Sequence, residues 1–240
     1  MSIDTTQTVR DIVQQHPAAV PVLESLGIDY CCGGGRSLED ACRKGNIQVD
    51  KVLSDLAAAL IARPSKDDAV WMSSTLSNLA DHIVQQHHEY SRRELTRLTA
   101  LAEKVFLKHG NKHPELAQIR DLVNAIASEM STHMLKEEQV LFPRLRLIEE
   151  AANNGTKPMP AFFGSLINPI RHMMADHDDT GESLRSIRAI SDGYQPPAGA
   201  CMSYQALYHG LADLEGDLHQ HIHLENNILF PRALEFERVH

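Results

Sequence analysis

The sequence predicts an all-α protein in which a small helical N-terminal domain precedes an antiparallel four-helix bundle. Apolar residues recur at intervals of three and four along nearly the whole chain, which is the spacing of one helix face. Alternation of β-branched residues, the pattern typical of strands, is scarce. Two segments in the second half of the chain match each other, which indicates a duplicated helix hairpin. The 240 residues, 42% of them hydrophobic, suffice for one large core or two smaller ones.

Residues 1–62 form the predicted N-terminal domain, because they contain short apolar-periodic stretches separated by helix start and stop signals. Ser37, followed three residues later by Asp40, has the spacing of a helix cap. Residues 28–35 read as a loop with two cysteines and three glycines. Residues 63–73 are polar and are predicted to be a linker to the second domain.

Residues 74–240 contain four apolar-periodic stretches, each long enough for a helix of roughly 30 residues. Glycine- and proline-bearing loops at 153–160 and 192–199 separate the second stretch from the third and the third from the fourth. Short loops between long amphipathic helices place consecutive helices antiparallel, so this part of the chain is predicted to be a four-helix bundle.

The internal repeat lies on the second and fourth helices of this bundle. Both segments have the pattern H-x3-E-x3-L-F-P-R, which begins at His133 in one copy and at His221 in the other. A lone histidine precedes each copy at nearly the same distance, His88 by 45 residues and His177 by 44 residues. Each hairpin therefore supplies one lone histidine and one His/Glu pair.

The His/Glu pairs occupy positions on the apolar face of their helices. Residues i and i+4 share a helix face, so His133 projects with Glu137 and His221 projects with Glu225. Four imidazoles and two carboxylates inside a dry bundle are costly unless they bind something. A structural duplication with surface salt bridges is the alternative, but both pairs continue an apolar seam.

A pair of metal ions satisfies this set of side chains. Each of the two carboxylates can bridge both ions, and each ion then takes two histidines. An octahedral ion retains one position for a bridging oxide or hydroxide and one open position. Imidazole and carboxylate ligands with open positions suit iron better than structural zinc, which prefers a closed tetrahedral set. The repeat therefore predicts a di-iron site.

The bundle resembles a hemerythrin-like domain, and the segment Asp29-Tyr-Cys-Cys-Gly-Gly34 resembles the short domain that precedes such a bundle in the repair-of-iron-centres family of the YtfE, ScdA and DnrN type. The resemblance implies two iron ions per chain, held in an oxo- or hydroxo-bridged centre. It implies a role in restoring iron–sulfur clusters damaged by nitric oxide or oxidants, with nitric oxide reduction as a proposed activity. The ligands it implies are those of the repeat: His88, His133, Glu137, His177, His221 and Glu225.

Oxygen-carrying hemerythrins have an additional histidine that makes their two irons unequal, and this chain has no clear counterpart. Simple oxygen carriage is therefore disfavoured. Three function classes remain: donation of iron to damaged iron–sulfur proteins, catalytic reduction of nitric oxide, and sensing of nitric oxide or oxygen.

Cys31 and Cys32 are candidate transfer thiols. Three glycines and a capped helix start follow them, and a helix N-terminus favours the thiolate. The glycines also allow close approach of a ligand or partner. The alternative is two buried thiols that pack a small core.

Three acids are candidates for contacting the metal ligands or for lining a route for iron or protons. Glu129 and Asp217 each lie four residues before a histidine of the repeat, and the alternative is that they are ordinary helix charges. Asp176 stands where the related proteins have Glu just before the third-helix ligand. His87 could replace His88 in another register, whereas His219 and His223 are expected to be solvated or to lie behind the ligands.

The charge balance argues against polyanionic partners. Lys and Arg number 23 against 32 Asp and Glu, a formal charge of −9, so neither nucleic acid nor an anionic membrane is an expected partner. The longest apolar run has seven residues, 56–62, well short of the roughly 20 that span a bilayer. No signal peptide is apparent, and the expected location is the cytoplasm. A homodimer is compatible with the sequence.

Overall fold

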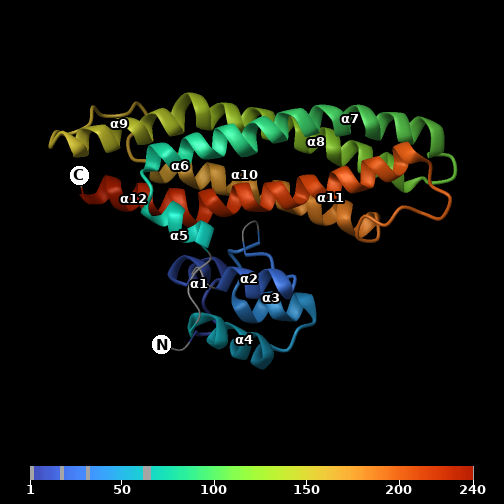
Figure 1. Cartoon of the computed structure of the whole chain (residues 1–240), viewed down its shortest axis with the longest axis horizontal. Helices are drawn as coiled ribbons and strands as arrows, with labels where there is room; N and C mark the ends of the chain where they lie inside the picture. Colours follow the sequence, from blue (N-terminus) through green and yellow to red (C-terminus); the bar gives the residue numbers. More distant parts are fainter. Residues whose placement is uncertain (1–2, 17–18, 31–32, 62–65, 240) are drawn as a thin grey trace.

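A computed structural model describes residues 3–16, 19–30, 33–61 and 66–239. It consists of a long helical bundle with a smaller helical domain packed against one side (Figure 1). Within these residues the structure contains no strand, and the one β-bridge joins Thr8 to Ser37. The prediction of an all-α protein is confirmed. Across the same ranges, no helix is long and apolar enough to cross a membrane.

In the described part of the N-terminal domain there are four α-helices, α1 (Val9–Gln15), α2 (Val20–Ser25), α3 (Leu38–Gly45) and α4 (Val49–Ile61). Ser37 caps α3 as its spacing from Asp40 predicts, since the Asp40 N–H donates to the Ser37 hydroxyl oxygen at 3.1 Å. The apolar core of this domain includes Ile12, Leu23 and Leu56, and it also includes Ile222 from the bundle. The two domains therefore share buried apolar surface.

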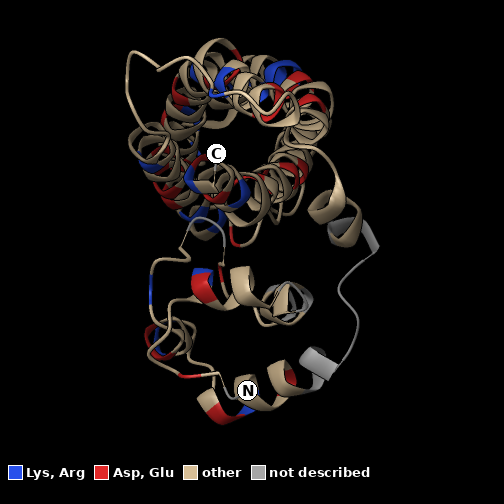
Figure 2. Ribbon diagram, turned by 90° about the vertical axis from the view of Figure 1, so that its left-hand side faces the viewer, with Lys and Arg blue, Asp and Glu red and all other residues tan. Residues whose placement is uncertain are grey.

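The segment predicted as a polar linker is largely helical. Helix α5 (Lys66–Ser73) occupies most of it and lies between the two domains (Figures 1 and 2). Trp71 stacks on His82 of the bundle with ring centroids 4.1 Å apart. Arg232 donates to the carbonyls of Trp71, at 2.7 Å, and of Ser74. One half-buried aromatic side chain and an arginine of the distant fourth rod thus hold a helix whose own sequence has no apolar face.

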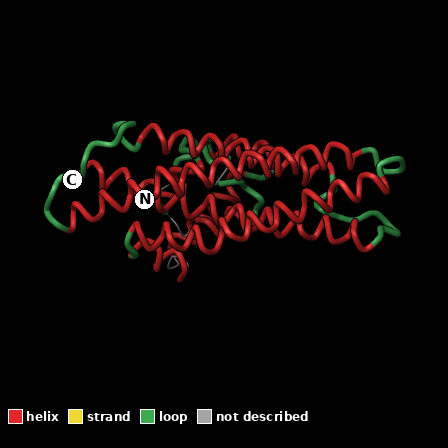
Figure 3. Tube along the Cα trace, turned by 90° about the horizontal axis from the view of Figure 1, so that it is seen from above, coloured by secondary structure: helices red, strands yellow, loops and turns green. Residues whose placement is uncertain are grey.

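The bundle has four rods, which run side by side in Figure 3 and surround a common interior when viewed along their axis in Figure 2. Three of the rods contain a π-helical turn. The elements are α6 (Leu76–His82), η2 (Ile83–His88) and α7 (Glu89–His109) in the first rod; α8 (Glu115–Lys136), η3 (Glu137–Leu141) and α9 (Phe142–Asn153) in the second; α10 (Ile167–Ile190) in the third; and α11 (Met202–His223), η4 (Leu224–Leu229) and α12 (Phe230–Val239) in the fourth.

Two apolar clusters fill the bundle and leave a polar layer between them. One cluster includes Leu98, Ile126 and Leu211, toward the end where the first rod turns into the second. The other includes Leu79 and Leu145, toward the chain's C-terminal end. The histidines and glutamates of the sequence repeat lie between these clusters. Apolar packing therefore borders that layer at both ends.

Candidate metal centre

The structure brings together all six side chains that the repeat identifies. They come from all four rods of the bundle, and each is at most 1% exposed: His88, His133, Glu137, His177, His221 and Glu225. Buried charged and polar groups at this density require partners, because an unpaired buried carboxylate is costly.

The first group of donor atoms consists of His88, His221, Glu137 and Glu225. The Nε2 atoms of His88 and His221 are 3.2 Å apart. His88 Nε2 lies 3.4 Å from Glu137 Oε2, and His221 Nε2 lies 3.0 Å from Glu225 Oε1. All four donor atoms lie within 4.8 Å of one another, so they converge on one small region of the bundle interior.

The second group repeats this arrangement with His133 and His177. Their Nε2 atoms are 3.0 Å apart, His133 Nε2 is 3.3 Å from Glu137 Oε2, and His177 Nε2 is 3.0 Å from Glu225 Oε2. Glu137 and Glu225 belong to both groups. Each carboxylate thus lies between two adjacent His pairs, which is the placement of a bridging ligand between two cations.

The charges within the site favour the binding of cations. Burial lowers the pKa of His133, but the Glu137 charge and the hydrogen bond with Asp176 outweigh it and raise that pKa to about 10. Burial raises the pKa of Glu225, but His221 and His177 outweigh it and hold that pKa well below its usual value. The negative charge of the buried carboxylates can therefore be balanced either by protons on the histidines or by metal ions.

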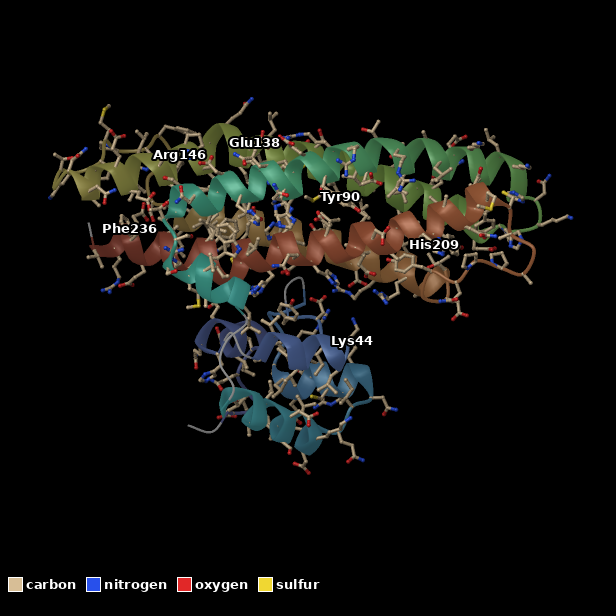
Figure 4. All side chains as sticks on the ribbon, viewed as in Figure 1. Lys44, Tyr90, Glu138, Arg146, His209 and Phe236 are labelled. Carbon is tan, nitrogen blue, oxygen red and sulfur yellow. The ribbon has the colours of Figure 1, made fainter. Side chains whose placement is uncertain are left out.

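Outer contacts orient three of the four histidines. His88 Nδ1 lies 2.6 Å from Glu138 Oε1, a residue labelled in Figure 4, and Arg92 Nη2 donates to the same oxygen at 2.5 Å. His133 Nδ1 lies 3.3 Å from Asp176, which also pairs with Lys136 at 3.1 Å. Such contacts fix the ring and direct the Nε2 lone pair into the site.

Of the remaining two histidines, His177 has an outer contact of this kind and His221 does not. His177 Nδ1 lies 2.9 Å from the side-chain oxygen of Asn226. For His221 Nδ1, the described part of the chain provides no hydrogen-bond partner, although the ring of His87 stacks 5.7 Å from it. Glu138 directly follows Glu137 and Asn226 directly follows Glu225, so the two occupy equivalent positions of the repeat. Sequence reasoning missed both because they differ in type, but their shared register was the signal that could have found them.

The π turns place the glutamates. The Phe142 N–H donates to the Glu137 carbonyl and the Phe230 N–H to the Glu225 carbonyl, each five residues back. The next residue is a proline, Pro143 or Pro231, which has no N–H for an α turn. A widened turn absorbs this loss, and π turns of this kind are frequent at functional sites.

The prolines do not end either helix, since the second rod continues to Asn153 and the fourth to Val239. Turn widening, rather than helix termination, is the local effect of the two prolines.

The other residues of the repeat have structural roles. Phe142 and Phe230, each 1% exposed, stack on His88 and His177 with ring centroids 5.9 and 6.2 Å apart. Arg232 anchors α5, and Arg144 donates to the carbonyl of Met159 in the loop before the third rod. The repeated sequence thus encodes ligands, ring support, a wide turn and a loop anchor.

The other predicted site residues lie around this centre. Asp176 contacts His133, and it lines a polar cavity of about 300 Å3 together with Glu129 and His133. Asp217 contacts His87 at 2.9 Å rather than His221, and His87 lies outside both donor groups, which favours His88. Cys31 and Cys32 lie outside the described residues.

His223 is buried rather than solvated. It is 2% exposed, and the ring of Tyr30 packs edge-on against it at 5.6 Å. Tyr30 belongs to the N-terminal domain, which covers this face of α11. Of the two alternatives expected for His223, solvated or behind the ligands, the solvated one is therefore wrong.

A buried pair of adjacent His2Glu2 groups in a four-helix bundle defines a cation-binding protein of the hemerythrin class. Residues 79–233 match the family described as "Hemerythrin HHE cation binding domain". Residues 5–60 match ScdA_N, described as a domain of unknown function. The first of these matches agrees with the class that the site defines.

Full-length relatives are more specific. The chain is 35% identical over 231 residues to a probable iron–sulfur cluster repair protein of Haemophilus influenzae, an alignment that covers 95% of this chain and 96% of that protein. It is also 35% identical over 231 residues to the iron–sulfur cluster repair protein YtfE of Enterobacter sp., covering 96% and 98% of the two chains. The chain belongs to the family of YtfE-type iron–sulfur cluster repair proteins, with a hemerythrin HHE domain.

Proposed function

We propose that this chain is a di-iron protein that repairs iron–sulfur clusters damaged by nitrosative or oxidative stress, by donating iron to them. The observation that carries the proposal is the pair of adjacent donor groups that share Glu137 and Glu225. The printed names of the relatives, iron–sulfur cluster repair proteins, support the biological role. Damaged iron–sulfur proteins, in the cytoplasm, are the proposed clients.

Iron is the proposed metal because each group offers two imidazoles and two carboxylates. Ligands of this kind suit a ferrous or ferric ion that keeps open positions, whereas structural zinc sites are closed. His88, His221 and the two glutamates would hold one ion, and His133, His177 and the same glutamates the other. An oxide or hydroxide bridge would complete the pair.

The route that we propose for iron is the polar cavity beside His133. Glu129 and Asp176 line it with Asp179, so it offers three carboxylates to a cation. Hydrogen bonding to His133 lowers the pKa of Asp176 to about 2, which keeps this acid charged at neutral pH. Lys136 pairs with Asp176 at 3.1 Å and would have to move for a cation to pass.

An experiment with isotopically labelled iron tests donation. The two-iron protein is mixed anaerobically with an iron–sulfur enzyme whose cluster nitric oxide has damaged, and label and recovered activity are followed together. A donor transfers at most its own iron and stops. Glu129→Gln with Asp176→Asn should slow the transfer, whereas Glu103→Gln, an exposed acid on α7 that contacts Arg120, should not.

Nitric oxide reduction with the same pair of ions is the alternative, and the open coordination positions favour it. A reductase consumes nitric oxide over many turnovers with an external reductant and keeps its iron. Reversible nitric oxide or oxygen binding without iron loss would instead indicate a sensor. Either result would contradict donation as the primary role.

The two cysteines of the N-terminal domain are proposed to act in transfer. Cys31→Ser with Cys32→Ser is expected to leave both irons bound and to impair repair. Loss of iron in this double variant would contradict that separation of roles. A homodimer is part of the proposal only if sedimentation of the iron-loaded protein gives twice the mass of the 26.8 kDa chain.

A further inference from the structure

The N-terminal domain holds the π turn that carries one of the bridging glutamates. Helix α1 packs against η4, and the side-chain amide of Gln14 donates to the main-chain carbonyl of Asn226 at 3.1 Å. Ile222, fully buried, lies in the apolar core of the N-terminal domain. Ile222 and Asn226, which directly follow His221 and Glu225, thus contact a domain that supplies none of the six side chains of the site.

The Gln14 contact answers a local requirement of the backbone. In an α turn the Asn226 carbonyl would accept from the Phe230 N–H, but that group donates to Glu225 instead. In a π turn the donor would be residue 231, which is a proline and has no N–H. A buried carbonyl needs a partner, and the Gln14 amide is one that another domain supplies.

The side chain of Asn226 reaches the site from the same turn. Its Oδ1 lies 2.9 Å from His177 Nδ1, and both residues are 0% exposed. When His177 Nδ1–H donates to this oxygen, the Nε2 lone pair points toward His133 and Glu225. Gln14 therefore fixes the turn whose side chain fixes the His177 ring.

The equivalent position of the repeat is held differently. Glu138 orients His88, and Arg92, a residue of the bundle itself, holds Glu138. The N-terminal domain also contacts α10 beside His177, since Arg10 pairs with Asp178 at 3.4 Å and Asp29 pairs with Arg185. The N-terminal domain thus contacts both α10, which carries His177, and η4, which carries Asn226. The His88 and His177 halves of the site therefore differ in which domain supports the histidine.

We infer that Gln14 and Asn226 are positioning residues that couple docking of the N-terminal domain to metal retention at the His133–His177 position. When the domain is docked, the turn is fixed and His177 is held for coordination. When the domain moves away, as on engaging a client, the support of His177 is lost and this ion is released more readily. The ion at His88 and His221 keeps its own support. The presence of two ions and the link to a client both rest on the proposed function.

Chelator capture of ferrous iron from the full-length protein tests the coupling. In Gln14→Ala and Asn226→Leu, one of the two irons should be captured about 10–100-fold faster, the usual effect of losing an outer contact, and the other at the wild-type rate. Asn226→Asp, which keeps the acceptor oxygen, should restore slow capture. Gln15→Ala is the matched control, because Gln15 is exposed on the same helix and contacts only Gln7 among the described contacts.

Amide hydrogen exchange of the metal-free protein gives a second readout. Gln14→Ala should accelerate exchange in 224–230 and leave η3, residues 137–141, unchanged. The inference would be overturned if the chelator captured both irons equally faster, or if amide exchange in η4 were unchanged. If Gln14→Ala behaves as wild type while labelled iron still reaches the client, the coupling fails and donation stands. If the variant releases one iron selectively but no iron reaches a client, the coupling stands and donation fails.

Discussion

Glu138 provides a quantitative test of how the site is built, because it contacts a predicted ligand without lying in either donor group. Its Oε1 lies 2.6 Å from His88 Nδ1. Burial raises the pKa of Glu138, but the hydrogen bonds with His88 and Arg92 lower it by more, so the group is a carboxylate at neutral pH. Loss of such an outer contact typically weakens metal binding by about 10–100-fold. That factor corresponds to about 1.4–2.7 kcal/mol.

The loss of affinity in a Glu138 variant should affect one of the two ions. Glu138 contacts His88 alone among the four histidines, so Glu138→Ala should weaken the ion at His88 and His221 and spare its neighbour. Asp176→Ala should do the reverse through His133, with a smaller effect, since that contact is longer at 3.3 Å. Anaerobic titration of each variant against a chromophoric chelator should show one strong and one weakened ferrous site.

Glu94→Ala is the matched control. Glu94 lies on α7 downstream of His88 and pairs with Arg93 and Arg97. It should bind both irons as the wild type does. If Glu138→Ala weakens both irons equally, or neither, then the outer contact does not support His88, and the assignment of separate supports to the two ions is wrong.

Three further predictions concern the bridges, the ring support and the proton. Glu137→Ala or Glu225→Ala should reduce iron content sharply, because each carboxylate belongs to both donor groups; near-full iron by elemental analysis would contradict bridging. Phe230→Ala should lower the free energy of unfolding of the metal-free protein by about 3–5 kcal/mol, the usual cost for a buried Phe, as measured by urea denaturation; a loss below 1 kcal/mol would mean that the ring does not fill the core. Iron affinity should fall as pH falls through the neutral range, because the raised pKa of His133 makes the ion compete with a proton there. The expected change is up to about tenfold per pH unit for each proton displaced. Chelator titration at several pH values measures the affinity, and a flat profile would contradict the prediction.

The sequence predicted the helical class and the six converging side chains because both depend on periodicity. The repeat places His133 with Glu137 and His221 with Glu225 on one helix face, and no tertiary information is needed to see it. The lone histidines were located by their equal distances from the two copies of the repeat. Apolar residues before and after these positions then fixed which way the polar side chains point.

Features that depend on contacts between distant segments were not predictable in this way. Helix α5 depends on Trp71 meeting His82 and on Arg232, which lies far along the chain. Two of the π turns, η3 and η4, precede a Phe-Pro step, which signals a lost hydrogen bond but does not say how the chain absorbs it. The π turn η2 has no such signal in its sequence. Glu138 and Asn226 were missed because one residue type does not repeat, although the position does.

Metal content per chain, measured together with the visible absorption spectrum, tests the central claim most directly. The protein is produced with ample iron, and elemental analysis is compared with the protein concentration. Two adjacent donor groups predict about two irons per chain and the absorption bands of a bridged ferric pair. Zinc alone, or no metal after anaerobic reconstitution with ferrous iron, would show that the repeat is a scaffold and that the di-iron account is wrong.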